Sequence, residues 1–242
     1  MKEVKIYKDV RALDVQAFKM LRQSKLLVDY DGVVLTSPRI NKYIQSKCEK
    51  YVSFITGIYG KDKLQVLNKH LYTTHGHTVS GLRTLGYSVN MCEFNKYVYD
   101  DIDFNRLTLC DDELDILGLE SLAKRDDVYI FSNAPAAWIV GTLSANTITR
   151  KLIPRIKIIK LFGSEIIKPQ LKVYLEVAKT LKSKDDTDLF LLDDNFLNVQ
   201  SAVQVKNWKG LWLSGEDFRV NEDIQSVKNV NSALFQINLA HH

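Results

Sequence analysis

The fold of this chain is decided by the segment Lys25-Leu26-Leu27-Val28-Asp29-Tyr30-Asp31-Gly32-Val33-Val34-Leu35-Thr36. Leu26 to Val28, together with Tyr30, read as a short buried strand, because the apolar run is too short for a helix and ends in a β-branched residue. Asp29 and Asp31 come at its carboxyl end and are followed by a glycine. Ligands of an open α/β sheet bind just outside the carboxyl ends of its strands. The segment therefore indicates a ligand site, although Asp and Gly are also favoured in a plain turn.

The spacing of the two carboxylates bears on their chemistry. Side chains two residues apart on an extended chain point the same way, while the backbone freedom of Gly32 allows Asp31 to be aimed differently. Two unpaired carboxylates that lie close together repel, and one of them has a raised pKa unless a cation intervenes. A nucleophile with a partner acid, or a shared metal site, explains such a pair.

The composition is that of an ordinary globular protein. The chain has 242 residues, of which 45% are hydrophobic and 26% charged, and this suits one sizeable domain or a core with a smaller insert. No apolar run approaches the ~20 residues of a membrane span, and the charged N-terminus lacks the apolar core of a secretory signal. Cys48, Cys92 and Cys110 suit reduced thiols in the cytoplasm. The net charge of +4 permits an anionic substrate but does not indicate a nucleic-acid surface.

The order of expected elements indicates a helical insert followed by an α/β core. Apolar residues at three- and four-residue steps, with Asn90 as one N-cap, predict helices at 10–21, 40–55, 61–72, 91–99 and 111–122, with another short element at 79–85. After these the chain alternates in the manner of βαβ units. Strands are expected at 128–131, 189–192 and 210–213, with helices at 136–144, 171–181 and 199–205. A last helix and a strand within 232–237 are expected to finish the chain.

Three of the expected strands end in polar residues, namely Asp29 with Asp31, Ser132 with Asn133, and Asp193 with Asp194. The strand ends of a parallel sheet with right-handed crossovers meet at one edge. Several carboxylates at one edge need a cation, and hard oxygen ligands suit Mg²⁺. We expect Asp29, the backbone carbonyl of Asp31, and one of Asp193 and Asp194 to bind it.

A carboxylate beside Mg²⁺ can attack phosphorus and form an acyl phosphate. Asp31 can then protonate the leaving alkoxide and later take a proton from water. Ser132 and Asn133, with neighbouring backbone N–H groups, and the Lys168 ammonium are expected to bind the charged phosphoryl oxygens. Lys168 would also offset the surplus negative charge.

Each of these assignments has a structural alternative. Ser132-Asn133 can simply cap the helix that Pro135 starts. Lys168 can be a solvated lysine at a helix start, and Asp193-Asp194-Asn195 can be a turn before the next helix. The order of the residues, each at a strand end, favours the catalytic interpretation.

These segments resemble the four motifs of the haloacid dehalogenase (HAD) superfamily of phosphatases over about residues 26–213. The four matching segments are Asp29-Tyr30-Asp31-Gly32-Val33-Val34, Phe131-Ser132-Asn133, Lys168-Pro169, and Leu192-Asp193-Asp194-Asn195 with Asn198. The resemblance implies that Asp29 is the nucleophile and Asp31 the general acid/base. It implies that Asp194 binds Mg²⁺ and that Asp193 is a water-mediated or second ligand. The second Asp of the first motif separates the phosphatases from the dehalogenases, which lack it, whereas Asn198 stands where many members carry a second acid.

The helical insert is similar, from Leu71 to Leu82, to the cap segment of pyrimidine 5'-nucleotidase-type members. The similarity implies that Tyr72 and His75 contact substrate, although position 75 is frequently Tyr in those proteins. The alternative, that this segment only caps and joins two helices, stays open. His75 and His77 can also be read as a metal pair, but nothing supplies the remaining ligands.

The sequence thus predicts a doubly wound α/β fold with a parallel, Rossmann-like HAD core at 1–37 and 116–242 and an all-helical cap at 38–115. The expected function is Mg²⁺-dependent hydrolysis of a small phosphomonoester through an aspartyl phosphate, with a pyrimidine nucleoside 5'-monophosphate as substrate and no nucleic-acid or membrane partner. One alternative is a phosphatase of a sugar phosphate or a phosphoglycolate-like metabolite. The other is a non-catalytic nucleotide-binding module, against which the retention of Asp29, Asp31 and Lys168 argues.

Overall fold

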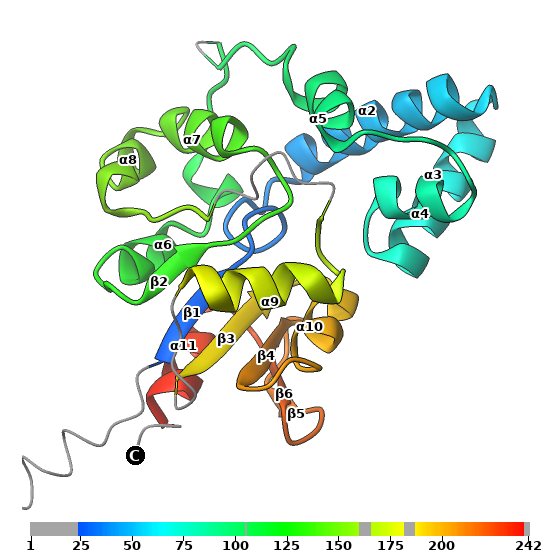
Figure 1. Ribbon diagram of the computed structural model, residues 1–242. Helices are drawn as coiled ribbons and strands as arrows, with labels where there is room; N and C mark the ends of the chain where they lie inside the picture. Colours follow the sequence, from blue (N-terminus) through cyan, green and yellow to red (C-terminus); the bar gives the residue numbers. More distant parts are fainter. Residues whose placement is uncertain (1–23, 105, 160–165, 182–186, 240–242) are drawn as a thin grey trace, which may run out of the picture.

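The computed structural model describes residues 24–104, 106–159, 166–181 and 187–239. Its centre is a sheet with the strand order β2-β1-β3-β4-β6-β5 (Figure 1). The strands are β1 (Ser24–Val28), β2 (Val128–Ile130), β3 (Asp188–Asp193), β4 (Trp208–Leu213), β5 (Phe218–Arg219) and β6 (Ile224–Val227). Neighbouring strands are parallel except for β5 and β6, which are antiparallel. The α/β fold with a mostly parallel sheet is therefore confirmed.

The strand order places β1 at a switch point. The chain runs from β1 to β2 on one side, and then passes across β1 to β3 on the other. Ligands of open α/β sheets bind in the crevice outside the strand ends at such a point. The fold therefore directs attention to the residues that follow β1.

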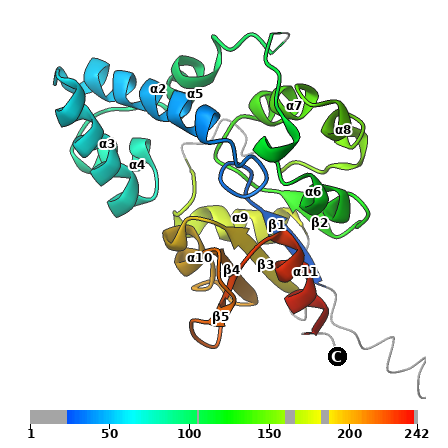
Figure 2. The ribbon, with the colours of Figure 1, turned by 180° about the vertical axis from the view of Figure 1, so that it is seen from behind.

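The sheet is covered on both faces (Figure 1, Figure 2). In β1, Leu26 and Val28 pack into one apolar cluster, while Leu27 packs into another on the opposite face. This alternation is the two-residue period of a strand, with both faces buried as in parallel sheets. The first cluster includes residues of α6 (Ile116–Leu122), α7 (Ala136–Ser144) and α11 (Val230–Leu239), and the second includes residues of α9 (Leu171–Thr180) and α10 (Phe196–Ala202).

Four helices inserted between β1 and β2 form a cap beyond the carboxyl ends of the strands (Figure 1, Figure 2). They are α2 (Pro38–Thr56), α3 (Lys61–His75), α4 (Thr78–Thr84) and α5 (Met91–Tyr99). They share an apolar cluster of their own, which also includes Ile167, the residue before Lys168. An all-helical insert agrees with these elements, while the division of the chain at residues 38 and 115 stays a prediction.

Helix α5 begins and ends where the sequence indicated, whereas α3, expected at 61–72, continues to His75. Asn90 caps α5, because its side-chain oxygen accepts hydrogen bonds from the backbone N–H groups of Cys92 and Glu93. The α2 helix ends at Gly57, which adopts the left-handed conformation that terminates many helices.

Two expected elements are wrong in detail. The helix expected at 111–122 is interrupted, because Leu114 is extended and Asp115 starts α6 by accepting from the Gly118 N–H; only a 3-10 turn, Asp111–Glu113, precedes it. The C-terminal stretch 232–237 holds no strand but lies within α11, and β5 and β6 come before it. Its buried residues Val230, Ala233 and Ile237 recur at helical spacing.

The remaining short elements are α8 (Thr147–Arg150) and a 3-10 turn at Ile153–Arg155. The helix expected at 10–21 lies outside the described residues. Within the described part of the chain, no helix combines the length and apolar character that crossing a membrane requires.

Candidate active site

The first strand ends in a tight loop that carries both carboxylates of the first motif. The backbone N–H of Asp29 continues the ladder to the carbonyl of Leu192 (2.8 Å). The loop then turns, since the N–H groups of Val34 and Leu35 both donate to the Tyr30 carbonyl at 2.9 Å. The Asp29 carboxylate is nearly buried and accepts from the Tyr30 N–H at 2.8 Å. Its position is therefore fixed by the backbone.

Gly32 is required in this loop for two reasons. Its φ of +86° lies in the left-handed region, where the backbone of a residue that carries a Cβ atom is strained. A Cβ atom at this position would also lie 2.2 Å from Oδ2 of Asp194. The glycine thus lets the loops after β1 and β3 approach each other closely.

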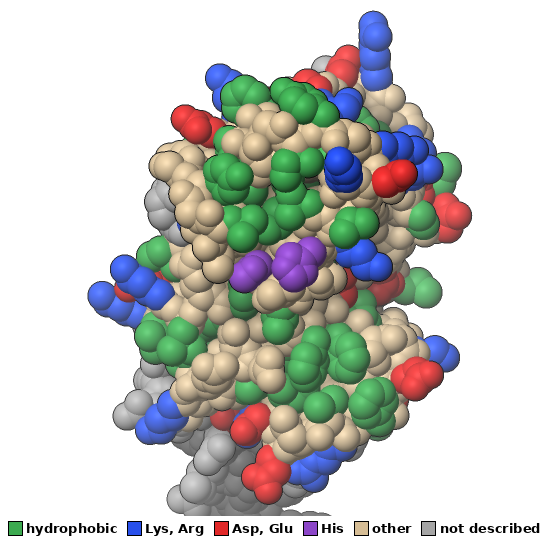
Figure 3. Space-filling view, turned by 90° about the vertical axis from the view of Figure 1, so that its right-hand side faces the viewer, with side chains coloured by type: hydrophobic (Ala, Val, Ile, Leu, Met, Phe, Trp, Pro, Cys, Tyr) green, Lys and Arg blue, Asp and Glu red, His purple; other side chains and the backbone are tan. Residues whose placement is uncertain are grey.

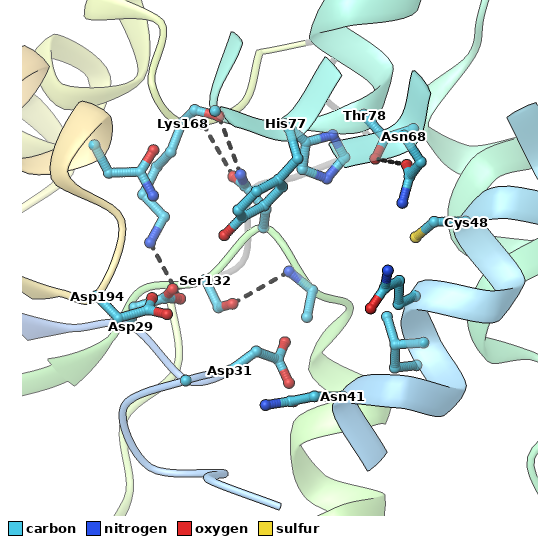
Figure 4. Close-up of a pocket in the computed structure, with 18 of the residues that line it drawn as sticks. Asp29, Asp31, Asn41, Cys48, Asn68, His77, Thr78, Ser132, Lys168 and Asp194 are labelled. Carbon is cyan, nitrogen blue, oxygen red and sulfur yellow. Dashed lines mark hydrogen bonds and ion pairs between the residues drawn. The ribbon is translucent and has the colours of Figure 1, made fainter. Parts of the chain in front are cut away.

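Carboxylates from these two loops form a cluster. Asp29, Asp193 and Asp194 each offer an oxygen atom, and these oxygens lie within 4.8 Å of one another. Figure 4 shows Asp29 and Asp194 side by side at the base of a pocket, next to Ser132. The neighbouring strands β1 and β3 produce this cluster by ending in register, with Val28 opposite Leu192.

Lys168 neutralises part of this charge. Its side chain is 1% exposed, and Nζ lies 2.6 Å from Oδ2 of Asp193 and 3.1 Å from Oδ1 of Asp29. It also donates to the carbonyl of Phe131 at 2.9 Å. Burial alone would lower the pKa of Lys168, but the two carboxylates raise it above its ordinary value. The lysine is therefore a fixed cation that joins the loops after β1, β2 and β3.

Asp193 and Asp194 have different surroundings, and the sequence alone could not decide which of the two would bind a metal ion directly. Asp193 is fully buried and accepts from Lys168, from the Asn195 N–H and, with both oxygens, from the side-chain amide of Asn198. Burial raises the pKa of Asp193, and the Lys168 ammonium lowers it in part. Asp194 is an exposed residue, but its carboxyl group lies within the cavity, and desolvation there together with the charges of Asp29 and Asp193 raises its pKa to about 8. Asp194 is thus the carboxylate that would gain most from a cation.

Asp31 faces the same cavity as Asp29 (Figure 4). Its Oδ1 accepts a hydrogen bond from the indole Nε1 of Trp138 at 2.9 Å. Burial raises the pKa of Asp31 to about 7; the Trp138 bond and Lys168 act against this rise, and the Asp29 charge adds to it. A carboxyl group with such a pKa can hold or release a proton near neutral pH.

The two residues after β2 differ in what their side chains do. The Asn133 amide makes two hydrogen bonds to the backbone of Lys168, accepting from its N–H at 2.9 Å and donating to its carbonyl at 3.1 Å. Its side chain therefore holds the lysine segment in place. The Ser132 hydroxyl accepts from the Ala134 N–H at 3.3 Å and lines the cavity beside Asp29. A role of either residue toward phosphate stays a prediction.

The cavity has a volume of about 620 Å³ and lies between the core and the cap. Figure 3 shows the side of the molecule on which these two parts meet, with histidine side chains at the margin of the cap. Tyr72 lines the cavity, and its contact with substrate stays a prediction. His75, half-buried at the end of α3, is not among its lining residues, whereas His77 is. His77 is therefore the cap histidine that the geometry favours.

The roof of the cavity presents hydrogen-bond donors. The Nδ1 atom of His77 accepts from the Val79 N–H at 3.1 Å, and burial lowers the pKa of this ring to about 4. A neutral ring with Nδ1 engaged carries its proton on Nε2. Nearby, the Asn68 oxygen accepts from the Thr78 hydroxyl at 2.9 Å, so the amide nitrogen of Asn68 is left to donate (Figure 4). Sequence reasoning did not identify Asn68, because a lone Asn within a helix carries no signal.

No family model matches this sequence, and no curated protein matches it. Among solved structures it is similar to YfnB, a HAD-hydrolase of Bacillus subtilis bound to magnesium, with 13% identity and a TM-score of 0.52 over 89% of this chain and 98% of that one. It is similar to a HAD phosphatase from Thermococcus onnurineus, with 16% identity and a TM-score of 0.50 over 91% and 99%. It is also similar to a dehalogenase with an intermediate complex, with 12% identity and a TM-score of 0.53 over 89% and 97%. At such identities a likeness shows the fold alone, and the chain therefore has the fold shared by the hydrolases of the HAD superfamily.

Proposed function

We propose that the protein is a Mg²⁺-dependent phosphomonoester hydrolase that uses Asp29 as its nucleophile. The observation that carries the proposal is the placing of Asp29 at the switch point of the sheet, bound to a buried lysine and facing the same cavity as Asp31. A binding module has no need for a nucleophile and a proton donor at one cavity. A dehalogenase would not need the second carboxylate at position 31.

The residues suited to hold Mg²⁺ are Asp29 and Asp194, with Asp193 behind them. These residues fit Mg²⁺, because their carboxylate oxygens are hard ligands that lie close together. The single positive charge of Lys168 also does not neutralise the negative charges of three carboxylates. Asp193 is already engaged by Lys168 and by amide N–H groups, so it orients the site. When bound, Mg²⁺ would act as a Lewis acid that offsets charge on the phosphoryl oxygens.

In the first step, an oxygen of Asp29 attacks phosphorus, and the bond from phosphorus to the leaving oxygen breaks. Asp31, protonated at the start, gives its proton to that oxygen, and an aspartyl phosphate forms on Asp29. The Lys168 ammonium and the Ser132 hydroxyl hold the phosphoryl oxygens. The pKa of about 7 supports this starting state of Asp31.

In the second step, the Asp31 carboxylate takes a proton from water as the water oxygen attacks phosphorus. The bond between phosphorus and Asp29 breaks, which releases phosphate and restores both carboxyl groups to their starting states. Because Asp31 serves both steps, its loss affects formation and hydrolysis of the aspartyl phosphate.

The cap side of the cavity supports a nucleoside 5'-monophosphate as the substrate. A volume of about 620 Å³ suits a small organic molecule. The wall offers the aromatic side chains of Tyr72 and Phe94 together with the donors of His77 and Asn68. Flat faces and N–H donors suit a base whose ring carries carbonyl oxygens, and a pyrimidine is the smallest such base.

The test is a panel of phosphomonoesters assayed for phosphate release with Mg²⁺, containing pyrimidine and purine nucleotides, sugar phosphates, phosphoglycolate and p-nitrophenyl phosphate, alongside 2-haloacids assayed for halide release. We expect phosphate release to be highest with pyrimidine nucleotides, and no halide release. Tyr72→Ala and His77→Ala should change the ranking of nucleotides more than they change p-nitrophenyl phosphate hydrolysis. His75→Ala is the matched control and should leave the ranking unchanged. Halide release without phosphate release would overturn the proposal.

A further inference from the structure

Trp138 lies behind the proposed acid/base residue. It comes from the first turn of α7 and is 1% exposed. Its indole N–H donates to Oδ1 of Asp31 at 2.9 Å. When Asp31 is ionised, the charge of the acceptor makes this one of the stronger kinds of hydrogen bond.

The same helix holds the residue before Asp31. The Thr142 hydroxyl lies 2.8 Å from the carbonyl of Trp138 and shares a hydrogen bond of 2.6 Å with the Tyr30 hydroxyl. Trp138 and Thr142 are four residues apart and therefore share one face of α7. This face binds two consecutive residues of the loop after β1.

The indole ring has little freedom to move. The rings of Tyr99 and Phe104 lie 5.2 and 6.1 Å from that of Trp138, centroid to centroid. Trp138 is not among the residues that line the 620 Å³ cavity. Trp138 lines a separate, smaller cavity and therefore contacts Asp31 from outside the space that the substrate would occupy.

We propose that Trp138 is a positioning residue, which fixes the Asp31 carboxyl group so that Oδ2 faces the leaving oxygen and later the attacking water. The proposal rests on the function proposed above. By occupying Oδ1, the indole N–H determines which oxygen carries the transferred proton. Without it, the carboxyl group can rotate, and proton transfer loses its fixed geometry.

The test compares Trp138→Phe with Trp208→Phe. Trp208 is the matched control, because it is 2% exposed and its indole nitrogen has no hydrogen-bond partner within the described residues. Each variant is assayed with p-nitrophenyl phosphate, whose leaving group needs no proton, and with an alkyl phosphate, whose leaving group does. The phosphorylated fraction of the enzyme during turnover is measured by mass spectrometry after acid quenching.

General acid–base catalysis contributes about 10²–10⁴-fold, so we expect Trp138→Phe to lower alkyl phosphate hydrolysis by about tenfold or more beyond any loss with p-nitrophenyl phosphate. With p-nitrophenyl phosphate the variant should accumulate phosphorylated enzyme, because hydrolysis of the intermediate also needs Asp31. Trp208→Phe should do neither. Equal losses with both substrates and no accumulation would overturn the positioning role.

A second variant, with benzothienylalanine at position 138, tests the proposal even if Trp138→Phe misfolds, because this amino acid keeps the shape of tryptophan and lacks only the N–H donor. We expect it to reproduce the same substrate dependence, and wild-type behaviour of this variant would contradict the proposal. A wild-type protein that hydrolyses no phosphomonoester would instead refute the proposed function itself.

Discussion

Replacing Lys168 by Met should destabilise the protein strongly. The lysine is 1% exposed, and its ammonium lies 2.6 Å from Asp193 and 3.1 Å from Asp29. At an effective dielectric constant of ~20, these attractions amount to about 6 and about 5 kcal/mol. The cost of removing the ions from water opposes them, and breaking one partner of a buried pair costs about 3–5 kcal/mol in total. We expect a loss of this size, since Asp193 would remain buried without its cation.

The measurement is the free energy of unfolding of the metal-free protein, obtained by urea titration. Lys209→Met is the matched control, because its ion pair with Asp223 lies at the surface, with side chains 41% and 49% exposed; such pairs contribute about 0–1 kcal/mol. Adding Asp193→Asn to Lys168→Met should recover part of the loss, since the buried charge is then removed. A loss no larger than that of the control, or a further loss in the double variant, would refute this reasoning.

Three other predictions follow from the same region. Gly76 ends α3 at φ +73°, and a Cβ atom there would lie 2.7 Å from Cδ of Pro169, the residue after Lys168. Gly76→Ala should therefore lower kcat/KM for all phosphomonoesters. Gly57→Ala is the control: it has a similar φ of +67° but open space around it, so it should lower the free energy of unfolding through backbone strain and leave kcat/KM unchanged. Asp31 and Asp194 have raised pKa values of about 7 and about 8. The stability that these two groups contribute to the metal-free protein should therefore be fully present below pH ~4 and be lost as the pH rises through 7 and 8. A urea midpoint that rises over this pH range, or whose dependence on pH is unchanged in Asp31→Asn and Asp194→Asn, would contradict this prediction. Activity should vanish in excess chelator, return with Mg²⁺ and return poorly with Ca²⁺, whose coordination is longer and less regular, and full activity in chelator would exclude a metal-dependent reaction.

The positions of the residues at the strand ends could be predicted from the sequence, because strand burial and sheet topology determine where these residues lie. Short apolar runs predicted β1, β2 and β3, and a parallel sheet brings the ends of adjacent strands together. These side chains accordingly lie at one site: the cavity is lined by Asp29, Asp31, Ser132, Lys168 and Asp194, whereas Asp193, at the end of β3, is fully buried. The spacing could not show that Asp193 and Asp194 have different roles, because this difference arises from the side chains of Lys168 and Asn198, which both form hydrogen bonds with Asp193.

The hydrogen bonds of Trp138 and Asn133 to distant segments could not be predicted. Trp138 belongs to the apolar core, as its type suggests, but its N–H reaches Asp31 across 107 positions of sequence because of how α7 is rotated. Asn133 is engaged by the backbone of Lys168, 35 positions away.

The end of α3 decides which cap histidine lines the cavity. The α3 helix was expected to end at Tyr72 but continues to His75 and stops at Gly76. His75 therefore stays on the helix, whereas His77 becomes the N-cap of α4 and turns toward the cavity. Helix ends are the least certain part of a periodicity argument, and here three residues decide which histidine lines the cavity.

The central claim is that Asp29 becomes phosphorylated during turnover. The most direct measurement is mass spectrometry of protein quenched in acid while it hydrolyses p-nitrophenyl phosphate with Mg²⁺, with Asp31→Asn used to slow hydrolysis of the intermediate. We expect one phosphoryl group on the peptide of residues 26–39, located by fragmentation on Asp29 and absent in Asp29→Asn. Release of phosphate by the wild-type protein with no phosphoryl group on Asp29, or with one on another residue, would contradict it.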